Sequence, residues 1–517
     1  MPTVLETLAY KPTELTFGTS GLRGLVTDMT DLECYINTAG FLAFLQHSEG
    51  LQRGATVYVG GDLRDSTPRI LRVVTQAVVD AGFEAVYCGL IPTPTLAYYA
   101  LQKQSPCIMV TGSHIPADRN GIKFYKSAGE VLKDDEQPIF AAVKEARERL
   151  YGQVMDSSAF TAQGTLQSAM ELPVATTEAA SMFLERYRQV FAADTFAGRK
   201  IVLYQHSAVG RDMLADILES LGATVVPVGR SDTFIPIDSE NVTPDDQAYF
   251  HKLASEHSDA FAIVSTDGDS DRPFVVDAHG VFHRGDVLGA VVADWLQVDF
   301  AAYPVSASDA VDNYLREQNV PVQHTKIGSP YVVKAMQAAV AQGKQRVGGW
   351  EVNGGFLLGC NIALGGGKLQ ALPTRDAFLP ILGTLVAALQ KQLSISELFA
   401  QLPQRYTQAG LIDNFPSEVS VHIVQHFSED SPESHTELGK YFSPEHGFGA
   451  ISRIDATDGV RIFFSNGDIA HLRPSGNAPQ LRIYSVSSSQ ERADEVVAMA
   501  IAEPDGIFRS IERSVAK

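Results

Sequence analysis

The sequence predicts an α/β protein with three similar α/β domains, each built on a doubly wound sheet, and a smaller C-terminal α+β domain. Three observations predict this fold class. The chain has 517 residues, which is too long for a single hydrophobic core. Up to about residue 403, short apolar runs alternate with helical periodicity, the pattern of parallel strands joined by helices. Beyond that point, strands of alternating apolar and polar residues indicate antiparallel pairing.

The composition is that of an ordinary globular protein, with 45% hydrophobic and 20% charged residues. The formal net charge of -20 argues against a nucleic-acid surface, which normally carries a basic balance. The four cysteines are scattered without zinc-type spacing, which is typical of reduced thiols. We find neither a signal-peptide pattern nor an apolar window of the ~18 residues that a membrane helix needs. We therefore expect a cytoplasmic protein with no membrane or nucleic-acid partner.

The first predicted domain, residues 1–155, contains an apolar run that ends just before Ser113. Because the loops at the carboxyl ends of parallel strands share one edge of a sheet, we expect Ser113 and Arg64 on the same rim. The polar residues 156–167 are a predicted linker. The predicted elements are strand 56–62, helix 69–81, strand 83–88, helix 95–101, strand 107–110, strand 121–124 and helix 139–150.

The same alternation restarts twice and then changes. The predicted boundaries are 156–283 for the second domain, 284–403 for the third and 404–517 for the α+β domain. The second contains strand 200–204, helix 212–221, strand 224–228 and strand 261–265. The third contains strand 304–306, helix 309–317, strand 321–325, helix 332–341, strand 346–349 and helix 374–392. The fourth contains strands 460–464 and 481–486 and helix 490–501.

Three carboxylates follow the predicted strand 261–265 at alternate positions. In an extended loop Asp267, Asp269 and Asp271 lie on one face, and three hard oxygen ligands suit Mg²⁺. An EF-hand calcium loop would need Gly at its sixth position and Glu at its twelfth, where this chain has Arg272 and Ala278. That alternative fails, while an exposed acidic turn without an ion stays open.

Ser113 stands in a second candidate loop, directly after Gly112 and directly before His114. A hydrolase would need a G-x-S-x-G turn and a histidine remote in sequence. An adjacent histidine is poorly placed as the base of its own serine, so His114 either donates to a bound sugar or phosphate or is structural. A hydroxyl on a tight loop, together with three carboxylates, suits a phosphorylated side chain held on a divalent cation.

Two further stretches contain the groups that bind phosphate. Residues 17–24 combine three glycines and two hydroxyls with Arg23, and residues 473–477 combine a guanidinium, a hydroxyl and an amide around a glycine. Glycine can expose backbone N–H groups to an anion, and arginine adds a charge-assisted fork. Each stretch by itself would more often be a turn.

Taken together, these stretches resemble the α-D-phosphohexomutases, a family that includes phosphomannomutase, phosphoglucomutase and phosphoglucosamine mutase. The resemblance covers nearly the whole chain and implies four domains around a central cleft. The matching stretches are the serine loop 111–116, the metal loop 267–272, residues 348–354 at the sugar-binding position and residues 473–477 at the phosphate-binding position.

The resemblance also implies a role for each matching residue. Ser113 would be a phosphoserine whose phosphate shares Mg²⁺ with the three aspartates, and Lys123 would be an acid or base. The other implied catalytic residues are His114, Arg23 and Arg272. The implied sugar-binding residues are Glu351 and Asn353. The implied phosphate-binding residues are Arg473, Ser475, Gly476 and Asn477.

We expect an enzyme that interconverts mannose 6-phosphate and mannose 1-phosphate, activated by a hexose 1,6-bisphosphate, as a monomer or small homo-oligomer. A phosphoglucomutase or a dual-specificity enzyme is the near alternative; a non-catalytic sugar-phosphate sensor and a phosphatase are more remote. The sequence departs from the family where Asn353 and Gly355 replace a serine and a histidine, and where Asn477 and Ala478 replace Thr-Glu or Thr-Thr. These departures affect sugar specificity and the identity of a second acid or base.

Overall fold

The structure is a computed structural model that describes residues 1–18, 21–168, 170–475 and 479–515. The chain divides into two compact units. The first comprises Met1–Ala301 and Gly328–Phe399, and the second comprises Ala302–Ile327 and Ala400–Lys517. Within the described residues, no helix combines the length and the apolar character that a bilayer crossing requires.

The first sheet of the first unit is mixed, with the strand order β1-β2-β6-β5-β3-β4 and with β7 paired to β6. Strand β3 pairs in parallel with β4 and β5, whereas β5, β6 and β2 pair antiparallel. Its strands are β1 (Thr16–Phe17), β2 (Leu22–Leu25), β3 (Thr56–Gly61), β4 (Glu84–Leu90), β5 (Cys107–Val110), β6 (Arg119–Lys126) and β7 (Gly129–Glu130). Its helices are α1 (Val4–Thr7), α2 (Asp31–Ser48), α3 (Thr67–Asp80), α4 (Thr93–Gln102) and α5 (Lys133–Tyr151).

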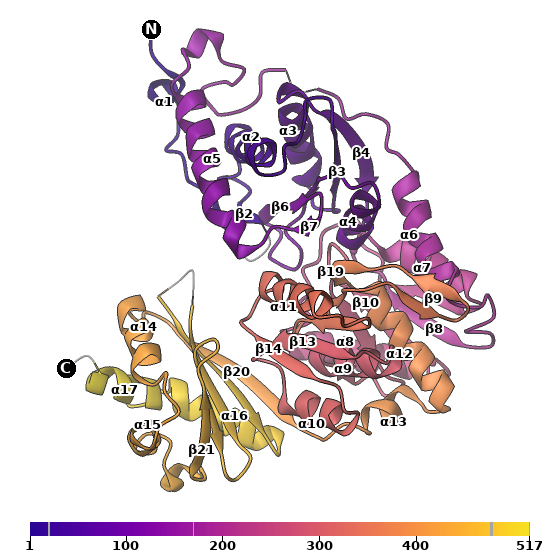
Figure 1. Cartoon of the computed structure of the whole chain (residues 1–517), viewed down its shortest axis with the longest axis vertical. Coiled ribbons are helices and arrows are strands. Elements are labelled where there is room, and N and C mark those ends of the chain that lie inside the picture. Colours follow the sequence, from indigo (N-terminus) through magenta and orange to yellow (C-terminus); the bar gives the residue numbers. More distant parts are fainter. Residues whose placement is uncertain (19–20, 169, 476–478, 516–517) are drawn as a thin grey trace. The chain divides into compact units, whose positions relative to one another are not determined.

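Both faces of this sheet are covered by helices (Figure 1). Alternate residues of a strand point to opposite faces, so Ile108 packs in the core formed with α2, α3 and α5. Its neighbours Cys107 and Met109 pack in the core formed with α4. The predicted doubly wound arrangement is therefore confirmed, and it leaves the loop after β5 at the edge of the sheet.

The rest of the first unit repeats this architecture. Its second sheet has the order β12-β11-β10-β8-β9, with β8 parallel to β9 and β10. Strands β15, β16 and β19 pair antiparallel, and β17 and β18 form a hairpin. The strands are β8 (Lys200–Tyr204), β9 (Thr224–Val228), β10 (Ala262–Thr266), β11 (Pro273–Val276), β12 (Phe282–His283), β15 (Val347–Trp350), β16 (Phe356–Leu358), β17 (Ile362–Leu364), β18 (Gly367–Leu369) and β19 (Leu372–Asp376). The helices are α6 (Glu178–Arg188), α7 (Arg211–Ser220), α8 (Pro244–Glu256), α9 (Gly285–Trp295), α11 (Ser329–Ala341), α12 (Phe378–Lys391) and α13 (Ile395–Phe399).

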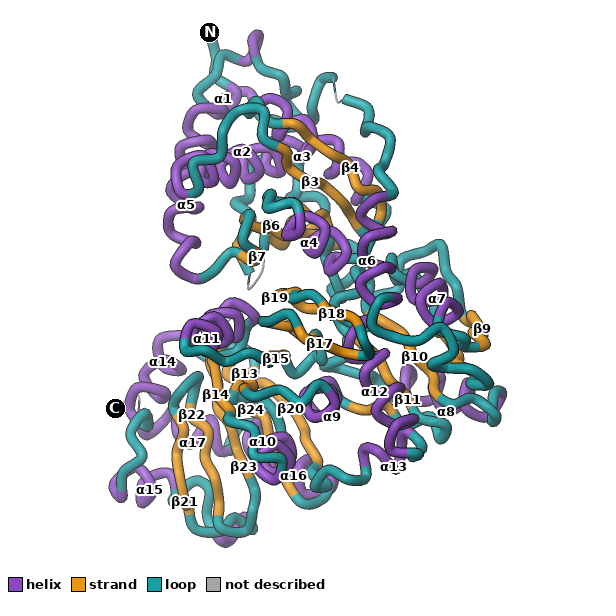
Figure 2. The backbone as a smooth tube through the Cα atoms, turned by 45° about the vertical axis from the view of Figure 1, so that its right-hand side comes forward, coloured by secondary structure: helices purple, strands orange, loops and turns teal. Residues whose placement is uncertain are grey.

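The second unit is built on an antiparallel sheet with the order β20-β24-β23-β22-β21 (Figure 2). The predicted change to a C-terminal α+β architecture is therefore confirmed. The strands of this sheet are β20 (Tyr406–Ile412), β21 (Ile451–Asp455), β22 (Val460–Phe464), β23 (Ile469–Pro474) and β24 (Leu481–Ser487). Its helices are α14 (Ser417–His426), α15 (Pro432–Leu438), α16 (Gln490–Ile501) and α17 (Ile507–Val515). The segment 302–327 adds the end of β13 (Phe300–Pro304), α10 (Asp309–Glu317) and β14 (Val322–Thr325).

Two predicted elements are wrong in position. The strand expected at 304–306 is β13, which ends at Pro304, because the N–H of Ala307 closes a turn onto the carbonyl of that proline. The helix expected to start at residue 374 begins at Phe378. Residues 374–376 belong to β19, and the carboxylate of Asp376 accepts the N–H of Phe378 at 2.9 Å at the start of the helix.

The segment predicted as a linker, residues 156–167, packs against the first sheet. Phe160 and Leu166 are buried in the core that α2, α3 and α5 form, and these two residues also make an isolated antiparallel bridge. The segment is polar overall, but its two buried apolar side chains make it part of the first core.

Candidate active site

Ser113 follows β5 in a backbone conformation that a serine rarely adopts, with φ of 55°. The loop is fixed from inside. The hydroxyl of Thr111 donates to Asp62 at 2.7 Å and accepts the N–H of Ser113 at 2.8 Å. The buried guanidinium of Arg64 donates to the carbonyl oxygens of Ser113, Ile115, Pro116 and Arg119. Arg64 is thus beside Ser113, as predicted, and it stabilises the strained loop.

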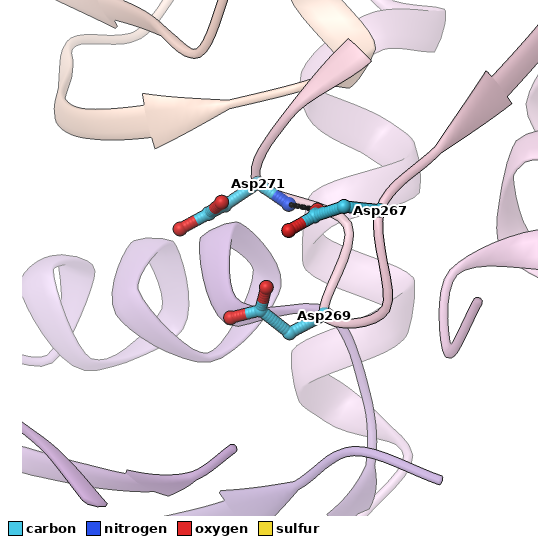
Figure 3. Close-up of side chains that lie close together, drawn as sticks. All are labelled: Asp267, Asp269 and Asp271. Atoms are coloured by element: carbon cyan, nitrogen blue, oxygen red, sulfur yellow. Dashed lines mark hydrogen bonds between the residues drawn. The ribbon is translucent and has the colours of Figure 1, made fainter. Parts of the chain in front are cut away.

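The three aspartates lie on the loop that joins β10 to β11 (Figure 3). Asp267, Asp269 and Asp271 are fully buried, and one carboxylate oxygen from each lies within 4.8 Å of the others. A Cβ atom on Gly268 would lie 2.7 Å from the carbonyl oxygen of Ser113, so the glycine allows the aspartate loop to approach the serine loop closely. The loop is therefore shaped both to gather carboxylates and to contact Ser113.

Ser113 and the aspartates meet directly. The Ser113 hydroxyl donates to Oδ2 of Asp267 at 2.6 Å, although the two residues are 154 positions apart. Oδ1 of Asp269 and Oδ1 of Asp271 are buried and accept no hydrogen bond from the described residues. Burying such oxygens unpaired is costly. An all-oxygen donor set with two unsatisfied members fits a hard divalent cation.

The electrostatics of this loop differ between its ends. Burial and the two neighbouring aspartates raise the pKa of Asp267 well above its usual range. Burial acts in the same direction on Asp271, but the charges of Arg375 and Lys123 outweigh it and lower the pKa of Asp271. A bound divalent cation would favour the ionised form of all three carboxyl groups.

Lys123 and Arg23 come from neighbouring strands of the first sheet. Lys123 on β6 places its Nζ 2.6 Å from Oδ2 of Asp269 and 2.7 Å from Oδ2 of Asp271. The side chain of Arg23 on β2 makes no hydrogen bond or ion pair with any described residue. Burial, followed by the charges of nearby arginines, lowers the pKa of Arg23. Lys123 is therefore already paired with two aspartates, whereas the guanidinium of Arg23 has no partner among the described residues.

His114 and Arg272 are linked through acidic residues that the sequence analysis did not single out. His114 places Nδ1 3.3 Å from the Ser113 hydroxyl and Nε2 3.8 Å from Asp238. Burial, followed by the charges of Arg272 and other cations, lowers the pKa of His114, so its imidazole is neutral near pH 7. Arg272 donates to Asp238 at 3.0 Å and to Glu240 at 3.3 Å.

The stretch with the sugar-binding resemblance is also buried in the first unit. Asn353 accepts the N–H of Gly355 at 3.0 Å and donates to Glu240 at 3.2 Å. Glu351 accepts a hydrogen bond from Arg375 at 2.6 Å. Arg375 is a site residue that the sequence analysis missed, because it falls within a segment predicted to be helical.

Arg473 lies at the end of β23 in the second unit. Its Nε is 3.1 Å from Oδ1 of Asp458, a second residue that the sequence analysis missed. The other oxygen of Asp458 accepts the N–H of Ile327 at 2.9 Å, and the carbonyl of Asp458 is 2.5 Å from Nε2 of His471. The side chain that orients Arg473 is thus itself fixed by the backbone and by a buried histidine.

The rest of this stretch is described only in part. The N–H of Ser475 donates to the carbonyl of Gln480 at 3.0 Å, which closes the loop between β23 and β24. Gly476 and Asn477, predicted to bind phosphate, lie outside the described residues.

Repeated α/β domains with a serine held against an aspartate triad are what the resemblance to the phosphohexomutases implies. The sequence matches four families of that class. These are phosphoglucomutase/phosphomannomutase alpha/beta/alpha domain I over residues 14–150, domain II over 181–280, domain III over 284–406, and the C-terminal domain over 428–503.

Proteins of known name and structure agree with these matches. A phosphomannomutase of Sinorhizobium fredii is 40% identical and covers 94% of this chain and 98% of its own length. A phosphomannomutase of Salmonella muenchen is 39% identical, covering 94% and 95%. A phosphoglucomutase/phosphomannomutase family protein from Burkholderia thailandensis has a similar fold, with a TM-score of 0.70, 18% identity and 98% of each chain covered. The chain belongs to the phosphoglucomutase/phosphomannomutase family of mutase isomerases.

Proposed function

We propose that this enzyme interconverts mannose 6-phosphate and mannose 1-phosphate through a phosphorylated Ser113 and a hexose 1,6-bisphosphate. The observation that carries the proposal is the 2.6 Å hydrogen bond from Ser113 to Asp267, which joins the serine loop to the metal loop. The two relatives named phosphomannomutase, at 40% and 39% identity over 94% of this chain, support mannose as the sugar.

In the proposed reaction, the bond between phosphorus and the Ser113 oxygen breaks as a sugar hydroxyl oxygen bonds to the same phosphorus. The hydroxyl proton passes to the neutral amine of Lys123, the candidate base. The ammonium that forms would be stabilised by Asp269 and Asp271, whose carboxylates lie 2.6 and 2.7 Å from Nζ. The bisphosphate then reorients, and its other phosphoryl group returns to Ser113. Arg23 and Arg272 would stabilise the transferring group, since phosphoryl transfer depends mainly on positioning and charge neutralisation.

Asp267, Asp269 and Asp271 would hold Mg²⁺, together with a phosphate oxygen on Ser113. The cation, when bound, neutralises charge on the transferring phosphoryl group. The chain would contribute as ligands the oxygens of Asp269 and Asp271 that accept no hydrogen bond from the described residues, and the ion pairs of Lys123 keep these carboxylates in place.

Each unit would contribute its own substrate-binding residues. Glu351 and Asn353 would hydrogen-bond sugar hydroxyls, and His114, as a neutral imidazole, would donate to a bound sugar or phosphate. Arg473, Ser475, Gly476 and Asn477 would bind the phosphate that does not react. The domain boundaries near residues 155, 283 and 403 and the monomeric or small homo-oligomeric state stay predictions.

A coupled assay with mannose 1-phosphate, glucose 1-phosphate and glucosamine 1-phosphate, each with a trace of hexose 1,6-bisphosphate, tests the proposal. We expect the highest kcat/KM with mannose 1-phosphate. Faster turnover of glucose 1-phosphate would make the enzyme a phosphoglucomutase, which the family also includes. Phosphate release without isomerisation would favour a phosphatase. No turnover together with an unmodified Ser113 would favour a sensor, and no turnover with a phosphorylated Ser113 would refute the catalytic assignment.

A further inference from the structure

Arg375, on β19, joins the metal loop to the sugar-binding stretch. Its Nε and Nη2 donate to Oδ2 of Asp271 at 3.1 and 3.0 Å, while its Nη1 donates to Oε2 of Glu351 at 2.6 Å. The arginine side chain is 6% exposed, so both ion pairs are shielded from water. A planar guanidinium can hold two carboxylates in a fixed relative orientation, which an ammonium group cannot do.

Arg375 is held in turn by groups on its other side. Its Nη1 lies 3.4 Å from the hydroxyl of Ser329, and that hydroxyl donates to Glu130 at 2.6 Å. The hydroxyl of Thr374 donates to the other oxygen of Glu130 at 2.5 Å. Glu130 is buried, so these hydrogen bonds hold Ser329 in place, and Ser329 in turn limits the rotamers that Arg375 can adopt.

The stem of Arg375 packs against Gly355. A Cβ atom built on Gly355 would lie 2.8 Å from Cβ, Cγ and Cδ of Arg375, closer than real side-chain contacts allow. The absence of a side chain at residue 355 therefore leaves the space that the stem of Arg375 occupies. The position of the Arg375 side chain, which contacts Glu351, therefore depends on the glycine at residue 355.

We propose that Arg375 is a positioning residue that orients Glu351 and thereby helps to select the sugar. This inference rests on the proposed function, because it assigns a sugar contact to Glu351. Arg375 fixes Oε2 of Glu351, and Oε1 makes no hydrogen bond with any described residue, so Oε1 is the oxygen left for a sugar hydroxyl. Because the same guanidinium binds Asp271, the orientation of Glu351 is tied to the metal loop.

The test is a double-mutant cycle with Arg375→Lys and Glu351→Gln. For each variant, kcat and KM are measured with mannose 1-phosphate and with glucose 1-phosphate. We expect Arg375→Lys to change the ratio of the two kcat/KM values about tenfold, chiefly through KM, because the lysine retains the charge but loses the fork. In the double variant the ratio should equal that of Glu351→Gln alone. An unchanged ratio in Arg375→Lys, or independent effects in the double variant, would overturn the inference.

Arg186→Lys is the matched control. Arg186 is as buried as Arg375, and it pairs at 2.9 Å with Asp376, the residue after Arg375. It contacts none of the proposed substrate-binding residues. We expect this variant to lose thermal stability without any change in the ratio. A similar ratio change in Arg186→Lys would mean that general loosening, not the orientation of Glu351, explains the result.

Gly355→Ala provides a second test that keeps every charge and does not depend on Arg375→Lys folding. The new methyl group displaces the stem of Arg375, so we expect the ratio to shift in the same direction as in Arg375→Lys. An unchanged ratio in Gly355→Ala would contradict the inference. If the unmodified protein turns over none of the sugar phosphates, the proposed function fails; if it is active and the ratio does not respond, only this inference fails.

Discussion

The serine site of the first unit and the Arg473 stretch of the second unit are stabilised in different ways. Around Ser113, each aspartate has several buried partners, and the side chain of Lys123 is 5% exposed. Among the described residues, Arg473 has a single ion pair, to Asp458, and its side chain is 22% exposed. We conclude that the first region is organised before substrate binds. In the second region, the proposed phosphate binding depends on one guanidinium, which Asp458 orients. Changes in the first should lower kcat, and changes in the second should raise KM.

Removing divalent cations should have the largest effect. We expect chelation to lower turnover by about a thousandfold or more, because a bound metal supplies several kcal/mol of charge stabilisation. Mg²⁺ should restore the activity and raise the thermal midpoint of the chelated protein, since a ligand of the folded state stabilises it. Asp269→Asn should abolish the midpoint shift, and Asp212→Asn, at an exposed surface ion pair, should not. A shift that persists in Asp269→Asn would place the cation elsewhere.

Gly268→Ala should lower kcat by about a hundredfold, because a displacement of about 1 Å at a reacting group has an effect of that size. The added methyl group would lie 2.7 Å from the carbonyl oxygen of Ser113 and would push the two loops apart. Steady-state kinetics, with circular dichroism as a check on folding, measure the effect. Unchanged kcat in a folded variant would contradict the claim that the first region is organised in advance.

Acid should weaken the second unit through His471. Burial lowers the pKa of His471 to about 4 from the usual 6.5. Between these two values the unfolded chain binds a proton that the folded chain does not, so stability is lost as pH falls from 6.5 to 4. At about pH 4.5 the loss should be roughly 2 to 3 kcal/mol. Denaturant unfolding measured across this pH range should show that His471→Gln lacks this loss of stability. An identical pH dependence of the unfolding free energy in both proteins would refute the role given to His471.

Asp458→Asn should have the smallest effect, raising KM for sugar phosphates about tenfold with little change in kcat, because Arg473 loses its charged partner. Asp309→Asn is the matched control in the same unit, since Asp309 pairs with Arg405 at 2.8 Å and the proposal gives neither residue a substrate contact. If Asp458→Asn instead lowered kcat at constant KM, the expected difference between the two regions, kcat effects in the first and KM effects in the second, would be wrong.

The sequence predicted the parts of the fold and site that local patterns encode. Ser113 and Asp267 each follow an apolar strand, and the loops after such strands carry the functional groups of doubly wound sheets. The strand 224–228 and the helices 309–317 and 490–501 were likewise predicted with the bounds that the structure shows, because their periodicity is uninterrupted.

The missed residues have no local pattern. Arg375 was hidden by a predicted helix that began at residue 374, four residues before α12 begins at Phe378. The polar contacts of residues 374–376 keep them in a strand, and these contacts join residues far apart in sequence. Asp238 and Asp458 were missed for a similar reason, since a lone acidic residue in a loop shows its partner only after folding.

The central claim is that Ser113 carries the phosphoryl group that is transferred. Intact-mass analysis after incubation with hexose 1,6-bisphosphate and Mg²⁺ tests it most directly, followed by addition of mannose 1-phosphate. We predict that the enzyme gains one phosphoryl group at Ser113 and passes it to the sugar, and that Ser113→Ala gains none and has no mutase activity. Phosphorylation of Ser113→Ala, or full mutase activity without phosphate on residue 113, would contradict the account.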